Sequence, residues 1–439
     1  MSGFMERSRG RGPTSRAAAD SAGEDSQPSL RVEHGDPLRD GKLPRCAVLV
    51  LNLDGKHHLD RCFGSLADSN YPRGKMSAVL VENGSSDGSA AHMRKHHDWV
   101  HLVENEDNVG FSAGCNQAAL AARDASRKGQ PEVLVFLNND MRVEPDFLRE
   151  LVAPIVRGEC VATTGRMLSW DGKLMNSAGG GMNFHGIGIQ RGYGDKLRPE
   201  YDVPRLSLFA CGGAMAMAAE LFHGLGGFDE EFFAYYEDVD LGWRTWVAGH
   251  SIHYAPRAIC YHHHSSTSAR LPKEMIRLLQ VRNPILACVK NYDDENLKRT
   301  LPAILALATR RMFLSSGLDD DSPFRIEEAM TRRAGTVARL WDRARSGAGG
   351  TIPIERIAAA DLIGLNDLLG RWGHWMERRS EIQQRRARSD EEIFKLFLKP
   401  LWCVEEESAY GELQTGLEDL LGLDELFAGL TSITGNPHK

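Results

Sequence analysis

The segment that decides the fold is Glu132-Val133-Leu134-Val135-Phe136-Leu137-Asn138-Asn139-Asp140. Its apolar run, 133–137, is typical of a strand that is buried on both faces. Two similar runs come earlier, at 45–51 and 77–81, and a helical pattern at 58–66 lies between them. Because strands alternate with helices, the sequence predicts an α/β fold whose mostly parallel sheet is covered by helices on both faces.

A polar cluster follows the run at 77–81, and in such sheets ligands bind beyond the carboxyl ends of the strands. Glu82, Asn83 and Asp87 offer acceptors and a flexible backbone to a nucleotide base and ribose. A plain loop rich in turn residues is the alternative that these residues alone favour.

A second polar cluster ends the segment 132–140. Asp140 places one hard carboxylate beside the amide oxygens of Asn138 and Asn139. Oxygen ligands of this kind suit Mg²⁺ or Mn²⁺, which complete their coordination with substrate phosphates. An Asn/Asp-rich turn before the helix near Pro145 explains the same residues equally well.

The segment Asn108–Asn116 contains two glycines and precedes a predicted helix at 117–125. Amides at a helix N-terminus, together with a backbone that a ligand can approach closely, suit a phosphate-bearing molecule. We therefore count Asn108 and Gly110 as candidate ligand contacts. Many helices begin in this way without binding any ligand.

The segment Phe228–Arg244 mixes carboxylates with aromatic and other apolar residues. Its six acids are Asp229, Glu230, Glu231, Glu237, Asp238 and Asp240. Carboxylates that lie against apolar surface have a raised proton affinity unless they are paired, so the segment can host a general base or a metal. The alternative is the start of an amphipathic helix, with acids at its positive N-terminus.

Two further segments carry unusual patterns. A predicted strand at 258–261 runs into His262-His263-His264, where adjacent side chains point to opposite faces, so that at most two can share a pocket. Three histidines at a strand end favour one metal ligand among them. In the apolar segment 208–217, the pair Gly212-Gly213 indicates a close approach to a ligand or, more simply, a strand bulge.

The composition excludes several classes of protein. The chain has 439 residues and a net charge of −7, which argues against a dedicated nucleic-acid binder. No apolar run approaches the roughly 20 residues of a membrane span, and no secretory signal is recognisable. Eight scattered cysteines fit buried thiols in a reducing compartment, so we expect a cytoplasmic protein. Residues 1–43 have the composition of a disordered leader.

The ordered set of motifs resembles the family 2 nucleotide-sugar glycosyltransferases, particularly their bacterial rhamnosyltransferase-like branch. The resemblance covers roughly residues 45–291 and implies a GT-A fold over 44–292, followed by a helical region over 293–439. The matching pieces are Val81–Asp87, Asn108–Phe111, Leu137–Asp140, Gly226–Glu230, Glu237–Leu241, the strand into His262, and Val281–Pro284 with Lys290 and Asn291 behind it.

The resemblance also implies an inverting transfer of a sugar from a dTDP- or UDP-sugar donor to a hydroxyl of a glycan or lipid-linked acceptor, in cell-surface polysaccharide synthesis. Glu82 matches the acid that bonds the base, where the family usually has Asp. Asp140 matches the last residue of a metal-binding D-x-D motif whose first acid is replaced by Asn138. Asp238, in the pair with Glu237, matches the catalytic base, and His262 matches a histidine that completes the metal shell in some relatives.

General chemistry agrees with this assignment. A base must remove the acceptor proton while the sugar leaves, and Asp238 beside Glu237 and Asp240 should have a raised pKa. Mn²⁺ or Mg²⁺ would neutralise the departing diphosphate. Aromatic residues of the same segment would wall the sugar site or belong to the core; they are Phe232, Phe233, Tyr235, Tyr236 and Trp243. Asp229 and Arg244 either pair with each other or contact the substrate.

Helical periodicity continues after the matched region, at 301–314, 325–344, 357–385 and 390–398. The first part is basic; its arginines are Arg310, Arg311, Arg332, Arg333, Arg339, Arg343 and Arg345. Peripheral contact with an anionic membrane or a lipid-linked acceptor is one interpretation, and self-association is another. We favour a solvated face with ion pairs.

Two other classes of function compete. A sugar-1-phosphate nucleotidyltransferase needs a Gly-rich basic loop after the first strand, where this chain has Asn52-Leu53-Asp54-Gly55-Lys56. A catalytically silent sugar-nucleotide-binding scaffold is supported by Asn138 and Glu82 but opposed by the intact pair Glu237-Asp238. Among the transferases, a galactofuranosyltransferase-like enzyme is the alternative to a rhamnosyltransferase. Whether His262 or His264 meets the metal stays open.

Overall fold

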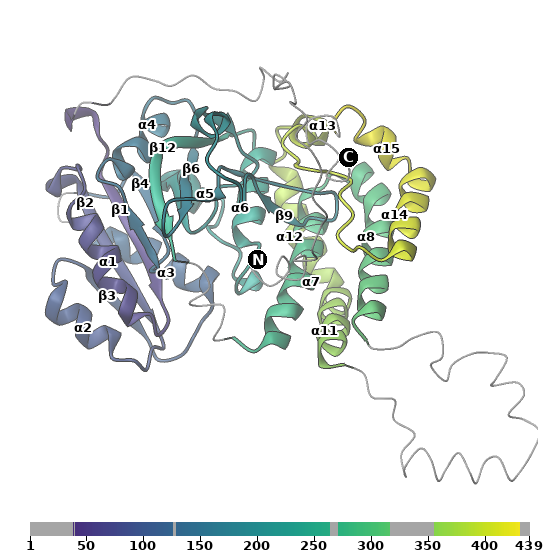
Figure 1. Cartoon of the computed structure of the whole chain (residues 1–439), viewed down its shortest axis with the longest axis horizontal. Coiled ribbons are helices and arrows are strands. Elements are labelled where there is room, and N and C mark those ends of the chain that lie inside the picture. The colour runs from purple at the N-terminus through teal and green to yellow at the C-terminus, as the bar shows by residue number, and fades with distance from the viewer. Residues whose placement is uncertain (1–37, 39, 126–128, 264–270, 317–354, 431–439) are drawn as a thin grey trace, which may run out of the picture.

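The computed structural model describes residues 38, 40–125, 129–263, 271–316 and 355–430 (Figure 1). In these ranges the chain forms a ten-stranded sheet with the main order β10-β12-β6-β11-β4-β1-β2-β3. These strands are β1 (Cys46–Asn52), β2 (Met76–Asn83), β3 (His101–Asn105), β4 (Val133–Leu137), β6 (Ala162–Ser169), β10 (Arg205–Leu206), β11 (Ala214–Ala218) and β12 (Ile252–His262). β5 (Met141–Val143) and β7 (Met175–Ser177) pair at its margin, and β8 (Gly180–Met182) with β9 (Gly188–Gln190) forms a separate hairpin.

The sheet is mixed but mostly parallel, as predicted. β1 pairs in parallel with β2 and β4, β2 with β3, and β12 with β6, whereas β11 runs antiparallel between β4 and β6. The predicted strand with a bulge at 208–217 is shorter than expected, because only its last part forms β11. Gly212 and Gly213 precede that strand rather than interrupt it.

Helices cover both faces of the sheet, because alternate residues of the central strands are apolar and buried. Cys46, Val48 and Val50 of β1 pack into one core cluster, together with residues of α1 (Lys56–Ala67) and α4 (Phe147–Val156). Ala47 and Leu49 pack into the other cluster, with α3 (Phe111–Ala125). α2 (Ser89–His96) lies beside α1 (Figure 1). Leu43, placed in the predicted leader, is also buried. The other leader residues lie outside the described ranges, apart from 38 and 40–42.

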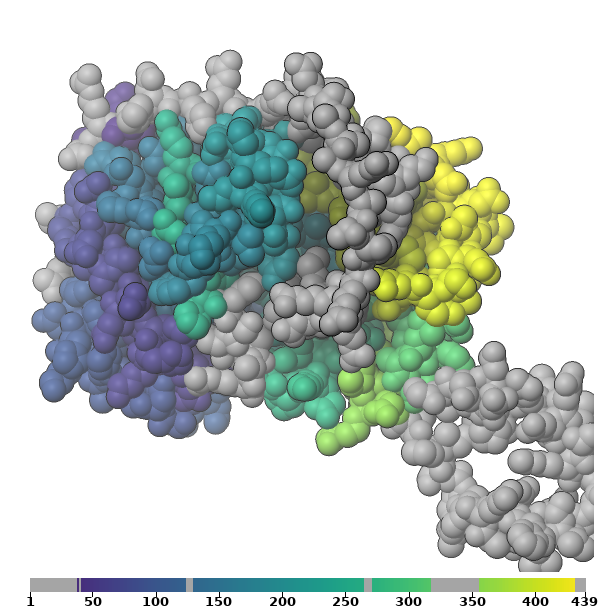
Figure 2. All heavy atoms as spheres, in the orientation of Figure 1, coloured from purple at the N-terminus to yellow at the C-terminus, as the bar shows by residue number. Residues whose placement is uncertain are grey.

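The second core cluster continues from the sheet into the C-terminal helices without a break. Three helices of the sheet domain come first: α5 (Ala219–Gly224), α6 (Glu237–Val247) and α7 (Lys273–Asn291). The described C-terminal helices are α8 (Asp294–Leu314), α11 (Arg356–Gly370), α12 (Trp372–Gln384), α13 (Asp390–Phe394), α14 (Ser408–Leu421) and α15 (Leu423–Leu426). Figure 2 shows the yellow C-terminal helices forming the side of the molecule away from the purple strands and helices. The single helix predicted over 357–385 is in fact two helices, which meet at Arg371.

Other predictions about this region can be placed only in part. Arg310 and Arg311 form ion pairs with Glu407 and Glu405, as the solvated-face interpretation expects. The predicted helix at 325–344, with the remaining arginines, lies outside the described residues. All eight cysteines are free thiols, and most are buried. Within the described ranges, no helix combines the length and the apolar character that a membrane span requires.

Candidate active site

The polar residues after β2 bond to one another. Both carboxylate oxygens of Glu82 accept from Asn52 Nδ2 at 3.0 Å, and the Ser89 hydroxyl donates to Oε2 at 2.9 Å. Asn139 Nδ2 donates to Asn52 Oδ1 at 2.5 Å, so a buried chain of side chains joins the ends of β1, β2 and β4. Gly55 is required here, because a Cβ on it would lie 2.1 Å from Asn139 Nδ2. The arrangement positions the Glu82 carboxylate before any ligand arrives.

Asn83, Asp87 and Asn108 hold the neighbouring loops. Asn83 Oδ1 accepts from the Val109 amide at 3.1 Å, and its Nδ2 donates to Asn108 Oδ1 at 2.8 Å. Burial alone would raise the pKa of Asp87, but donors that include the Lys56 amide lower it. The structure thus gives these three predicted contact residues a structural role. We call residues 82–88, 105–110 and 138–140 the strand-end loops.

The predicted phosphate site at the start of α3 is already filled by protein. The amides of Phe111 and Ser112 both donate to the carbonyl of Phe233, at 2.6 and 3.1 Å. Gly110 has φ +89°, and a Cβ there would lie 2.6 Å from a ring carbon of Phe233. Gly110 therefore leaves room for Phe233 to pack against the start of α3. The prediction that this helix end binds phosphate does not fit the structure.

Asp140 and His262 come together at the ends of β4 and β12. Asp140 is buried, and its Oδ1 lies 3.3 Å from Nε2 of the half-buried His262. A carboxylate with an imidazole is a donor set that Mn²⁺ accepts well, so these two residues fit the implied cation. His264 lies outside the described residues.

The sequence analysis missed His58, a buried residue of α1. Burial and then the charge of His57 lower the pKa of His58, while the nearby Asp140 opposes that shift. Among the described residues, its Nε2 atom has no hydrogen-bond partner, and its ring lies 5.0 Å from that of His263. The only signal in the sequence was its place in the first turn of the helix that follows β1, and many helices carry such a histidine.

A glycine turn joins this cation candidate to the acidic segment. The amide of Asn138 donates to the Gly213 carbonyl at 3.0 Å, and the amide of Gly212 donates to Asp238 Oδ2 at the same distance. A Cβ on Gly213 would lie 3.0 Å from Asn138 Nδ2, so a side chain there would crowd the junction. Asp238 and the end of β4 therefore flank one turn.

Glu237 and Asp238 begin α6 but differ in their access to solvent. Glu237 is 6% exposed, and within the described structure its Oε2 atom has no hydrogen-bond partner. Burial and then the charge of Asp238 raise the pKa of Glu237 well above its usual value. Burial also raises the pKa of Asp238, which remains half-buried and accepts from the Gly212 and Val239 amides. Asp238 is thus the accessible member of the pair, and burial sets Glu237 apart from direct substrate contact.

The backbone that precedes this pair is strained. Phe233, Tyr235 and Tyr236 have φ values of 60°, 67° and 70°, a region that costs free energy for residues with side chains. Asn283 of α7 holds this backbone: its Nδ2 donates to the carbonyls of Phe232, Ala234 and Tyr235 at 2.8 to 3.0 Å. We call residues 228–236 the acidic loop.

Neighbouring contacts fix the acidic loop further. Arg282 donates to the Glu231 carbonyl at 2.5 Å, and Arg371 binds both carboxylate oxygens of Glu231 at 2.6 and 2.9 Å. Asn116 of α3 donates to Glu230 Oε1 at 3.0 Å. Both carboxylates therefore anchor the loop to helices on either side.

The remaining acids belong to a buried ionic network. Lys290 lies 2.6 Å from Asp229 and 2.9 Å from Asp240, whose other oxygen accepts from Arg244 Nε at 2.7 Å. The ion pair between Asp229 and Arg244, one of the two predicted roles, does not form. Arg244 instead pairs with Asp240, and Asp229 pairs with Lys290. Burial would raise the pKa of Asp229, but the Lys290 ammonium lowers it. Arg378 adds a third cation 3.6 Å from Asp229, so both carboxylates of the network are compensated.

The aromatic residues of the segment divide between core and surface. Phe232 and Trp243 are fully buried and Tyr236 is 9% exposed, so these three are core residues and not walls of a sugar site. Phe233 and Tyr235 remain half-buried.

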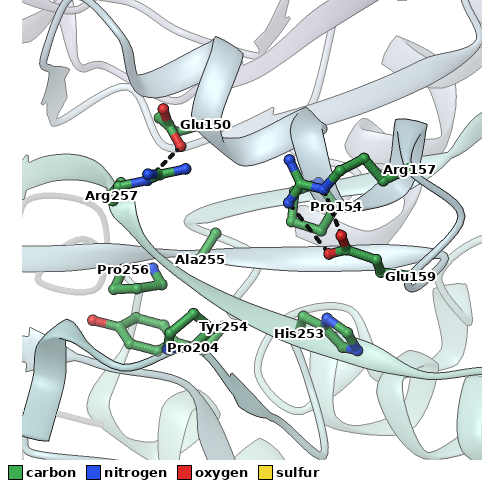
Figure 3. Close-up of a pocket in the computed structure, with 10 residues that line it drawn as sticks. All are labelled: Glu150, Pro154, Arg157, Glu159, Pro204, His253, Tyr254, Ala255, Pro256 and Arg257. Carbon is green, nitrogen blue, oxygen red and sulfur yellow. Dashed lines mark hydrogen bonds and ion pairs between the residues drawn. The ribbon is translucent and has the colours of Figure 1, made fainter. Parts of the chain in front are cut away.

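Two cavities lie apart from Asp238 and from the pair Asp140–His262. The hollow between α4 and β12 in Figure 3 has a volume of about 20 Å³, which is room for a water molecule and not for a substrate. A cleft of about 320 Å³ lies behind the acidic loop, against α12, and Asp229, Lys290 and Arg378 contribute to its lining. Its charged groups are largely engaged with one another, as the network above shows.

Comparisons with known proteins agree with the fold. The family model described as Glycosyl transferase family 2 matches residues 48–221. An N-acetylglucosaminyl-diphospho-decaprenol L-rhamnosyltransferase of Mycobacterium tuberculosis is 28% identical over 291 residues, covering 61% of this chain and 93% of that protein. The low-salt glycan biosynthesis hexosyltransferase Agl10 of Haloferax volcanii is 23% identical over 201 residues, covering 45% of this chain and 61% of that protein.

Among solved structures, GalNAc-T7 with UDP, GalNAc and Mn²⁺ aligns with a TM-score of 0.48 and 18% identity, covering 60% of this chain and 51% of that one. The family match includes Asp140 and ends before Asp238.

Proposed function

Because residues 48–221 form a glycosyl transferase family 2 domain, we propose that this glycosyltransferase works by inversion with the help of a divalent cation. A sugar passes from a nucleotide-diphosphate donor to an acceptor hydroxyl. The observation that carries the proposal is the glycine turn, where Gly213 contacts Asn138 and Gly212 contacts Asp238. These two contacts support a single cleft in which the leaving diphosphate faces Asp238 as the base.

In this proposal Asp238 removes the proton from the acceptor hydroxyl, and the oxygen forms its new bond to the anomeric carbon. The bond from that carbon to the diphosphate breaks on the opposite face, which inverts the configuration. The raised pKa of Asp238 matches the role, because a base must hold the proton it takes. Glu82, preset by Asn52 and Ser89, accepts a hydrogen bond from the nucleotide base.

Asp140 and His262 hold Mn²⁺ or Mg²⁺ in this proposal. The bound cation neutralises charge that develops on the diphosphate as the sugar leaves. We expect chelation to abolish transfer and added Mn²⁺ to restore it. We expect Asp140→Ala to remain inactive when Mn²⁺ is restored. Full activity in chelator would remove the cation from the proposal.

For the donor and acceptor, the mycobacterial relative supports rhamnose and a sugar carried on a lipid diphosphate. The experiment presents single sugar nucleotides, among them dTDP-rhamnose and UDP-galactofuranose, with a GlcNAc-diphosphate lipid in vesicles. Release of nucleoside diphosphate that depends on the acceptor, with an inverted linkage by NMR, would support the proposal. A retained linkage would refute inversion. Binding of a donor without turnover of any acceptor would favour the scaffold alternative.

A further inference from the structure

Helices α1 and α2 bring three metal-ligating side chains together on the surface beside the strand-end loops. Nε2 of His92 and Nε2 of His97 lie 2.7 and 2.8 Å from the same oxygen, Oδ1 of Asp60. The three ligand atoms all lie within 4.8 Å of one another. None of these residues takes part in the proposed transfer.

The surroundings hold the two imidazoles and leave the carboxylate adjustable. The side chains of His92 and His97 are 18% and 12% exposed, whereas that of Asp60 is 63% exposed. The His97 ring lies 5.7 Å from the buried Phe63 ring, and its amide donates to the Met93 carbonyl at 2.8 Å. The nitrogen donors are therefore preset, and solvent can reach the cluster on the side of Asp60.

The donor set points to a zinc-class cation. Zinc binds imidazole nitrogen and carboxylate oxygen at about 2.0–2.2 Å, which separates tetrahedral ligands by about 3.3 Å. The distances from Asp60 Oδ1 to the two imidazole nitrogens must therefore widen by roughly half an ångström, and the exposed Asp60 side chain can move by that much. We propose that Asp60, His92 and His97 bind one Zn²⁺ ion, with water completing the coordination. Mg²⁺ prefers oxygen ligands and would compete poorly.

An ion at this position would tie together the two helices that position the proposed nucleotide loop. α1 begins at Lys56, whose amide donates to Asp87 at 2.8 Å. α2 begins at Ser89, whose hydroxyl donates to Glu82 at 2.9 Å. Binding to the folded state alone raises the melting temperature, so the proposal predicts zinc-dependent stability.

The test uses the full chain, stripped with a chelator and titrated with Zn²⁺ in an excess of Mg²⁺. Bound zinc is counted after gel filtration, and the melting temperature is recorded. We expect His92→Gln/His97→Gln to lose one zinc equivalent and the zinc-dependent rise in melting temperature. Asp140→Ala should keep both, which separates this site from the active-site cation, and His101→Gln serves as the matched surface control.

Asp60→Asn provides a second measurement that does not depend on folding of the double variant, and it should weaken zinc binding on its own. Equal zinc uptake by the wild type, the double variant and Asp60→Asn would overturn the proposal. So would a wild type that takes up no zinc, since the cluster would then be a hydrogen-bonded contact between the helices.

Discussion

The strand-end loops and the acidic loop meet where Gly110 approaches Phe233, and they are stabilised in opposite ways. In the strand-end loops, polar side chains bond mostly to one another, as in the chain Asn139–Asn52–Glu82–Ser89. The acidic loop has a strained backbone that α7 holds from outside, through Asn283 and Arg282. The first arrangement is preset locally, whereas the second depends on helices that follow it in the sequence.

Asp238→Asn should cause the largest change in activity, because it removes the proposed base and keeps the shape of the side chain. We expect the turnover number to fall by about a hundred- to ten-thousandfold. Donor affinity should change little, since the strand-end loops are untouched, and calorimetric titration of the donor checks this. The exposed Asp171→Asn is the control. Normal turnover in Asp238→Asn would show that the base lies elsewhere.

Lys290→Met should cause the largest loss of stability. The change leaves Asp229 with the longer 3.6 Å ion pair to Arg378 and leaves Asp240 with Arg244 as its cation, and breaking a buried ion pair costs about 3–5 kcal/mol. Chemical denaturation measures the free energy of unfolding, with the exposed Lys298→Met as control. If both variants were equally stable, the network would not support the acidic loop.

Asn283→Ala tests whether α7 holds the strained backbone. Three hydrogen bonds to the acidic loop disappear, which should cost about 2–3 kcal/mol of stability and lower the turnover number more than it changes the donor KM. Asn296→Ala is a matched control, because Asn296 is a buried asparagine of α8 that bonds to Asp293. Equal activity in the two variants would contradict the positioning role.

Glu237→Gln should have the smallest effect, and mainly on the pH dependence of stability. A raised pKa in the folded state means that the stabilising contribution of Glu237 is present below its unfolded pKa and is lost as the pH rises through the folded value. The melting temperature of the variant should therefore fall less on alkalinisation than that of the wild type. Exposed Glu220→Gln is the control, and parallel pH profiles of wild type and Glu237→Gln would refute a buried neutral carboxyl.

Much of the sheet could be predicted from sequence, because its central strands are short apolar runs that end in polar residues. The family match over residues 48–221 agrees with the predicted fold, and the helices from α8 onward form the predicted helical C-terminal region. The apolar runs located the ends of β1, β2 and β4 to within about two residues. The helical periodicity of residues 357–385 could not locate the break at Arg371, because the apolar pattern continues on both sides of that residue.

Partners that are distant in sequence explain the failures at the site. The amides at the start of α3 looked available for phosphate, but Phe233 supplies a carbonyl to them from another segment. Asp229 and Arg244 belong to the same segment of sequence, yet Lys290 of α7 takes the Asp229 carboxylate. Tertiary contacts of this kind leave no local pattern, whereas Asp140 and His262 were both predicted near strand ends, and the structure brings these two residues together.

The hydrogen bonds from Asn283 also set a limit on how this enzyme can be cut and recombined. The matched family range ends at residue 221, before the proposed base Asp238 and before α7, which holds the acidic loop. A chimaera built by exchanging that range alone would combine one protein's strand-end loops with another's acidic loop and Asp238. Residues 222–291 should therefore be moved as one cassette when acceptor preference is to be transplanted.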